Sequence, residues 1–161
     1  MKKIFLITTM LSVMATIAVS QETETTPGRD LAETVFGSIE EHPNGIIDSG
    51  EFVNFEDTIF VSMDSDENLS LDFEEFTVFD FGFIQFADEA NQKRAYETAQ
   101  RIHFAFWDRD GDGTIGRREY HQSMIADFRR ADLDGDALLT RDEFLSGYVV
   151  NIAYRAAITG Q

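Results

Sequence analysis

The chain contains no cysteine and few basic residues, and both shortages limit what it can do. With no cysteine among its 161 residues, disulfide bonds, thiolate catalysis, thiolate zinc sites and a lipidated N-terminal cysteine are excluded. Only 13 lysines and arginines stand against 30 aspartates and glutamates, which gives a formal net charge of −17. So acidic a chain repels nucleic acid and anionic lipid, and we expect neither as a partner. No HExxH, GxSxG, P-loop or GxGxxG motif is present, and we expect no enzymatic activity.

The first 20 residues have the three-part layout of a secretory signal peptide. Lys2 and Lys3 give a positive start, and residues 4–19 are apolar with a few small hydroxyl residues. Ala18-Val19-Ser20 then supplies small residues at the −3 and −1 positions of a cleavage site. The apolar run is short for a membrane span of roughly 20 residues, so we predict that residues 1–20 are cleaved and leave no membrane segment.

We expect the mature chain to begin near Gln21 and to be periplasmic or secreted. Residues 21–29 are polar and contain Thr-Pro-Gly, which predicts a flexible leader. An exported protein without disulfides must be held together by its core or by metal. The hydrophobic fraction of 43% is sufficient for a core.

Four acidic loops fall into a regular frame of 12 residues. They begin at Glu40, Asp64, Asp108 and Asp132, so the first pair maps onto the second with a constant shift of 68 residues. Such self-similarity indicates an internal duplication. Apolar residues at helical spacing precede each loop, and an aromatic residue follows each one. This pattern predicts a helix on either side of every loop.

The predicted fold is all-α, with one pair of helix–loop–helix units in residues 30–86 and a second pair in residues 91–158. Only 12 residues separate the two loops of each half, residues 52–63 in the first and 120–131 in the second. At 1.5 Å per residue this is one helix of about 18 Å. A single short helix is therefore shared between the two loops of each pair.

The third loop offers a complete set of oxygen ligands for a hard divalent cation. Such a cation takes about six to eight oxygens, which a 12-residue loop supplies from positions 1, 3, 5, 7, 9 and 12. The loop reads Asp108-Arg-Asp110-Gly-Asp112-Gly113-Thr114-Ile-Gly116-Arg-Arg-Glu119. This pattern is similar to that of the EF-hand family, and the resemblance covers nearly the whole mature chain. It implies bound Ca²⁺ and side-chain ligation by Asp108, Asp110, Asp112 and Glu119, with the carbonyl of Thr114.

The second and fourth loops keep this frame but lack glycine at position 6. That position must turn with φ > 0, and here it holds Leu69 and Ala137. A left-handed residue with a β-carbon costs roughly 1–2 kcal/mol, or about tenfold in affinity, so we expect both loops to bind more weakly than the third. The implied ligands are Asp64, Asp66, Asn68, Ser70, Asp72 and Glu75 in the second loop and Asp132, Asp134, Asp136, Leu138 and Glu143 in the fourth.

The first loop, residues 40–51, is degenerate. Gly45 and Glu51 stand where the pattern requires them, but His42 is a poor ligand for a hard cation and Pro43 stiffens the loop. We expect this loop to serve as a structural partner of another loop.

Position 8 is apolar in every loop, where it is occupied by Ile47, Leu71, Ile115 and Leu139. In EF-hand pairs these residues form a short antiparallel bridge between two loops. The resemblance therefore predicts that Ile47 pairs with Leu71 and that Ile115 pairs with Leu139.

Two other features have structural interpretations that we favour. Residues 73–86 carry six phenylalanines, which either pack the two halves together or form a groove that metal binding opens for a partner helix. We favour packing. His103 and His121 belong to no zinc-binding spacing, and we expect them at the surface or at the edge of the core.

Three functions remain open. The favoured one is an exported calcium sensor or buffer. The short shared helix and the signal peptide also resemble the lanmodulin family of periplasmic lanthanide-binding EF-hand proteins, although that family carries proline at position 2, where this chain has Glu41, Ser65, Arg109 and Leu133. In the third, metal only stabilises a surface for an unidentified protein partner, and adding metal changes the exposed apolar surface little.

Overall fold

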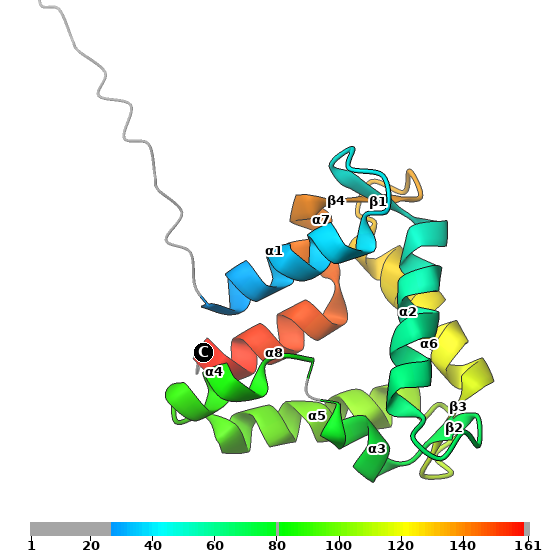
Figure 1. Cartoon of the computed structure of the whole chain (residues 1–161), viewed down its shortest axis with the longest axis vertical. Helices are drawn as coiled ribbons and strands as arrows, with labels where there is room; N and C mark the ends of the chain where they lie inside the picture. Colours follow the sequence, from blue (N-terminus) through cyan, green and yellow to red (C-terminus); the bar gives the residue numbers. More distant parts are fainter. Residues whose placement is uncertain (1–26, 80, 160–161) are drawn as a thin grey trace, which may run out of the picture.

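The computed structural model describes residues 27–79 and 81–159, and these residues are mostly helical (Figure 1). The prediction of an all-α fold is correct in outline, with the addition of four very short strands. In chain order the elements are α1 (Pro27–Ile39), β1 (Ile46–Asp48), α2 (Ser49–Met63), β2 (Ser70–Leu71), α3 (Phe73–Val78), α4 (Ile84–Glu89), α5 (Lys93–Trp107), β3 (Ile115–Gly116), α6 (Arg117–Ala131), β4 (Leu138–Thr140), α7 (Arg141–Gly147) and α8 (Val149–Thr159).

The N-terminal predictions fall largely outside the described residues. The predicted signal peptide, residues 1–20, and most of the predicted leader lie there. The leader's last three residues, 27–29, are instead the first turn of α1. Proline is compatible with that turn because its missing N–H would have no partner inside the helix.

The duplication seen in the sequence recurs in the helices. α2 and α6 have 15 residues each, and a shift of 68 residues carries one onto the other. Each begins where one loop ends and stops where the next loop starts. Both helices are longer than the 12 residues between the loops because the last three residues of a loop already form their first turn.

Loop and helix are joined by capping boxes. The side chain of Asp48 accepts hydrogen bonds from the first turn of α2, and Glu51 reaches back to the Asp48 N–H. Asp72 with Glu75 and Thr140 with Glu143 make the same reciprocal arrangement at α3 and α7. These contacts satisfy N–H groups that a helix start leaves without partners, so each loop ends at a defined residue.

The strands pair differently from the prediction. β1 pairs with β4, which places Ile47 opposite Leu139, and β2 pairs with β3, which places Leu71 opposite Ile115. The predicted pairing within each half was wrong because a helix of 15 residues is about 22 Å long. Such a helix keeps the two loops that it joins at opposite ends, as α2 does in Figure 1.

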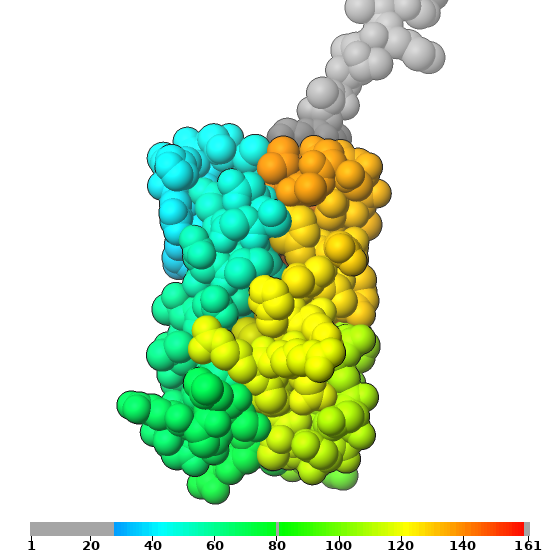
Figure 2. Space-filling model, turned by 90° about the vertical axis from the view of Figure 1, so that its right-hand side faces the viewer, coloured from blue at the N-terminus to red at the C-terminus, as the bar shows by residue number. Residues whose placement is uncertain are grey.

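α2 and α6 lie side by side (Figure 2), with the β1–β4 sheet at one end of the pair and the β2–β3 sheet at the other (Figure 1). Because the start of α2 meets the end of α6 at the β1–β4 sheet, the two helices run in opposite directions. Their facing residues belong to one hydrophobic core that draws on both halves, including Phe52 and Phe60 from α2 and Tyr120 and Phe128 from α6. Edge-to-face contacts join the rings of Phe52 and Phe128 and those of Phe60 and Tyr120.

The phenylalanine-rich segment packs into this core, as the favoured interpretation proposed. Phe76 and Phe83 are buried. The ring of Phe76 makes edge contacts with Phe104 and Trp107 of α5, and Phe79, Phe81 and Phe86 pack against the core from its edge.

One histidine is more deeply buried than predicted. His103 is 3% exposed, its Nδ1 lies 2.9 Å from the hydroxyl of Tyr154, and its ring centroid lies 3.8 Å from that of Trp107. Burial lowers the pKa of its imidazole to about 3. It is a neutral core residue, whereas His121 is exposed as expected.

Within residues 27–79 and 81–159, no helix has both the length and the apolar character needed to cross a membrane.

Two helical glycines provide a matched test of the packing. A β-carbon at Gly147 would lie 2.6 Å from the backbone Cα of Ala131, whereas one at Gly37 would meet nothing within 4 Å. Gly147→Ala should lower the free energy of unfolding by about 1–3 kcal/mol, because α7 would be forced away from α6. Gly37→Ala should raise it by about 0.5–1 kcal/mol through better helix propensity. Urea unfolding followed by circular dichroism measures both, and equal effects would contradict the close approach of α7 to α6.

Candidate metal centres

Three of the four loops bring carboxylate oxygens together. In each of them three acidic side chains offer oxygens that all lie within 4.8 Å of one another. These groups are Asp64, Asp66 and Glu75 in the second loop, Asp108, Asp110 and Glu119 in the third, and Asp132, Asp134 and Asp136 in the fourth. That spacing is small enough for one cation to contact several oxygens at about 2.3–2.6 Å.

The glutamate at position 12 is held in the same way in every loop. One of its oxygens accepts from N–H groups near the start of the loop, and the other accepts from the N–H at position 9. In the third loop Glu119 accepts from Arg109 at 2.9 Å, Asp110 at 3.2 Å and Gly116 at 3.0 Å. Glu51, Glu75 and Glu143 have equivalent partners in their own loops. The carboxylate that would close a cation site therefore also fixes the helix that follows.

The side chains at positions 1, 3 and 5 are positioned by the backbone of the same loop. In the third loop Asp108 accepts from the N–H of Gly113 at 3.0 Å, and Asp110 accepts from the N–H of Asp112 at 3.1 Å. Asp112 in turn accepts from the N–H of Thr114 at 2.9 Å. The second and fourth loops repeat these bonds, so equivalent backbone N–H groups hold the oxygens in all three loops.

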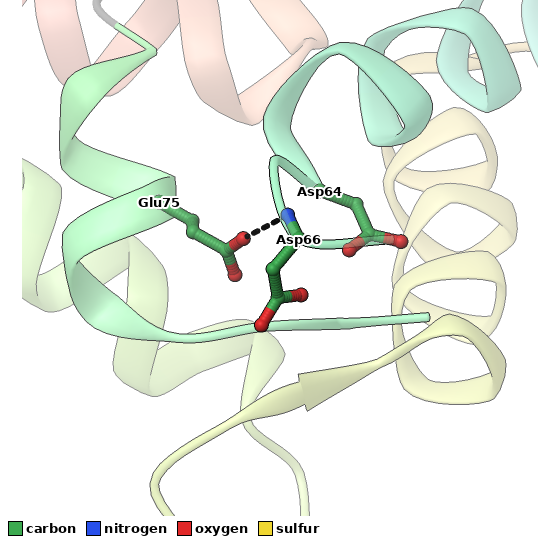
Figure 3. Close-up of side chains that lie close together, drawn as sticks. All are labelled: Asp64, Asp66 and Glu75. Atoms are coloured by element: carbon green, nitrogen blue, oxygen red, sulfur yellow. Dashed lines mark hydrogen bonds between the residues drawn. The ribbon is translucent and has the colours of Figure 1, made fainter. Parts of the chain in front are cut away.

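Figure 3 shows the second loop, where Glu75 reaches across from α3 toward Asp64 and Asp66. An oxygen of Glu75 accepts from the N–H of Asp66 at 3.3 Å. Asp66, Asp72 and Glu75 also line a cavity of about 340 Å³ between the end of α2 and α3. This loop is thus open to solvent on the side of its carboxylates.

Hydrogen bonding lowers the pKa of three position-12 glutamates, and two of these, Glu75 and Glu143, belong to the proposed ligand sets. Burial acts to raise the pKa of Glu75, but N–H donors of Asp72, Ser65 and Asp66 outweigh it and leave the pKa below its usual value. The hydroxyl and N–H of Thr140 lower the pKa of Glu143. Both side chains are anionic at neutral pH, which is the form that a cation requires.

Some predicted ligands stand outside the three groups. Asp72 accepts from the N–H of Glu75 at 2.8 Å as a helix cap, and Asp112 accepts from the N–H and hydroxyl of Thr114. Glu143 is likewise not part of the fourth loop's group. The amide of Asn68 donates to Asp66 at 2.8 Å. Ser70, Thr114 and Leu138, predicted to offer carbonyls, stand at or beside the strands.

The first loop gathers no such group among the described residues. Glu40 accepts from the N–H groups of Asn44 and Gly45, and His42 lies 3.4 Å from Glu51. Its strand β1 pairs with β4 of the fourth loop. The loop therefore has the role of a partner in a sheet, and that partner is the fourth loop.

Sequence reasoning missed a buried polar cluster between the loops. Glu56 lies in the middle of α2 with 2% exposure and accepts from the hydroxyls of Tyr120 and Tyr148, both at 2.6 Å. A signal for this was present, because Glu56 is four residues from Phe52 and from Phe60 and so shares their buried face. Its two partners lie 64 and 92 residues away, and no local pattern connects them.

No family model matches the chain, and no curated protein matches it.

The backbone at position 6 bears out the predicted strain. Leu69 has φ of 65° and Ala137 has φ of 66°, whereas Gly45 and Gly113 turn at 87° and 92°. Both residues carry a β-carbon in the left-handed region, which costs each folded loop stability.

Ala137→Gly should therefore raise the free energy of unfolding of the metal-free protein by roughly 1 kcal/mol. Ala105→Gly, an exposed position inside α5, is the matched control and should lower it by about 1 kcal/mol. Chemical denaturation in a chelator measures both. If both variants lowered the free energy of unfolding by the same amount, Ala137 would not be strained.

Proposed function

We propose that this protein is an exported calcium-binding protein of the EF-hand type, acting as a calcium sensor or buffer, with sites in its second, third and fourth loops. The supporting observation is the convergence of three carboxylates in each of these loops. Oxygen-rich sites of this kind suit a hard cation that accepts flexible geometry, which favours Ca²⁺. The third loop is the strongest site because it alone combines a full set of acidic side chains with glycine at position 6.

The strand pairing makes the two ends of the molecule unequal. β2 and β3 join the second and third loops, so one end holds two proposed sites. β1 and β4 join the first and fourth loops, so the other end holds one proposed site and a structural partner. We propose that cations influence each other's binding mainly at the β2–β3 end.

Export is proposed from residues 1–20, whose layout is that of a signal peptide. Outside the cytoplasm, calcium is abundant enough for weak sites to be filled. The loops then stabilise the fold as well as bind the ion.

Calorimetric titration of the metal-free chain from Gln21, with Mg²⁺ present, tests the proposal. We expect about three sites with dissociation constants of roughly 10⁻⁷ to 10⁻⁴ M. Glu119→Gln should remove the bidentate ligand and weaken the third site most. Glu89→Gln removes the same charge at an exposed position at the end of α4 and should leave binding unchanged. Unchanged binding in Glu119→Gln would contradict the assignment of the third loop.

The only tryptophan of the chain provides an independent fluorescence signal for the third loop. Trp107 immediately precedes Asp108, is fully buried, and donates from Nε1 to Asp127 at 3.0 Å. Its emission should change as the third loop fills. If Ca²⁺ produces neither heat nor a change in emission while Tb³⁺ produces both, the lanthanide alternative replaces the calcium proposal. If neither ion binds, the loops are structural.

A further inference from the structure

Glu56 is a buried carboxylate that ties three parts of the fold together. It projects from the middle of α2, and its two oxygens accept one hydroxyl from Tyr120 of α6 and one from Tyr148 at the junction of α7 and α8, both at 2.6 Å. The tyrosine rings are fixed by aromatic neighbours, since Tyr120 packs against Phe60 and Tyr148 packs against Phe52. The donors therefore cannot easily turn away from the carboxyl group.

This cluster accommodates Glu56 with or without a proton. As a carboxylate, Glu56 accepts from both hydroxyls. As a neutral acid, it accepts one hydroxyl at its carbonyl oxygen and donates its own proton to the other phenolic oxygen. Both forms keep two hydrogen bonds, but only the first places a negative charge in the interior.

The surroundings oppose that charge. Burial raises the pKa of Glu56 to about 7, although the hydrogen bonds from the two tyrosines act in the opposite direction, and the charge of Asp127 raises it further. Asp127 on α6 is fully buried, and burial raises its pKa to about 6 against the opposing effects of Trp107, Arg130 and Arg109. Asp57 lies beside Glu56 on α2 and is paired with Arg117 at 3.3 Å.

A cavity gives the charged form a place to be hydrated. Glu56 and Asn151 are the polar residues next to Tyr148 in a cavity of about 120 Å³ whose other walls are apolar, among them Phe55, Ile59 and Val150. A water molecule occupies about 30 Å³ of liquid, so this space can hold a few. Water that enters this space to solvate the carboxylate would weaken the apolar contacts between α2 and the start of α8 around it.

We propose that Glu56, held by Tyr120 and Tyr148, is a proton-binding switch whose ionisation loosens the packing of α2 against α6 and α8, and that cations in the loops promote release of this proton. The second half rests on the proposed function. Its physical reason is that α2 ends at Asp64 of the second loop, so a divalent cation there adds positive charge at one end of the helix that carries Glu56 and favours its anionic form.

The sign of the pH effect follows from the pKa values. The folded protein holds the proton on Glu56 up to about pH 7, whereas the unfolded chain releases it near 4.5. The proton on Glu56 thus stabilises the fold below pH 4.5, and this stabilisation is lost as the pH rises through 7. His103 acts in the opposite direction between about pH 3 and 6.5, because burial lowers its pKa from 6.5 to about 3, and this range overlaps that of Glu56. Only the difference between wild type and a Glu56 variant isolates the switch.

The first experiment needs no metal. Urea unfolding in a chelator between pH 4.5 and 8 compares the wild type with Glu56→Gln, whose amide mimics the neutral acid, and with Glu89→Gln as the exposed control. As the pH rises, the free energy of unfolding of the wild type should fall relative to that of Glu56→Gln, with a slope that approaches one proton per molecule. The wild type and Glu89→Gln should show the same dependence on pH. The same dependence of the free energy of unfolding on pH in the wild type and Glu56→Gln would overturn the switch.

A second variant tests the switch even if the Glu56→Gln protein does not fold. Tyr148→Phe removes one donor to the carboxylate, so the fall in stability, measured against the same exposed control, should move to higher pH. A variant that is destabilised equally at every pH would show that the tyrosine is only structural and would also overturn the switch.

The proposed coupling between cation binding and the proton on Glu56 is tested by measuring proton release. Adding Ca²⁺ to weakly buffered protein at pH 7 with an indicator dye should release up to about half a proton per molecule from the wild type and none from Glu56→Gln. Calcium binding without this release would overturn the coupling alone. Absence of calcium binding would overturn the proposed function together with the coupling, and the metal-free comparison would still decide the switch.

Discussion

The length of α2 and α6 determines where every loop lies. Each helix has 15 residues and spans about 22 Å, so the two loops that it joins cannot touch. Each loop must therefore find its strand partner on the other half of the chain, which it does through β1 with β4 and β2 with β3. The two antiparallel helices and the two sheets close into one core, and neither half buries its aromatic face without the other.

This arrangement gathers negative charge at two ends of a molecule that is already strongly acidic. At the β2–β3 end, six carboxylates from two loops lie close to a single small sheet. Their mutual repulsion is opposed by the loop N–H groups that donate to them, and a cation would relieve it further. At the other end the first loop contributes fewer acids, and its partner, the fourth loop, holds the only three-carboxylate group found there among the described residues.

The sequence predicted local structure well and long-range pairing poorly. The 12-residue frame, the shared helix and the strained turns at Leu69 and Ala137 all follow from residues close together in the chain, and the structure has each of them. The partner of Ile47 was predicted wrongly, although the length of the helix alone excludes Leu71. The contacts of Glu56 and the burial of His103 depend on tyrosines more than 50 residues away, and no periodic pattern indicates such partners.

The position-12 glutamates link the start of each loop to its end through hydrogen bonds, and these are the contacts that a bound ion would have to change. Glu119 accepts three N–H groups from its own loop, so its oxygens are already positioned near Asp108 and Asp110. A bidentate bond to a cation would compete with those donors for the same lone pairs. Binding would then weaken the hydrogen bonds between the glutamate and the start of the loop. In exchange, the cation would join the glutamate to the other carboxylates of the loop. Glu119 is followed directly by Tyr120, whose hydroxyl donates to Glu56 in the middle of α2, so the third loop and the Glu56 cluster are neighbours in the chain.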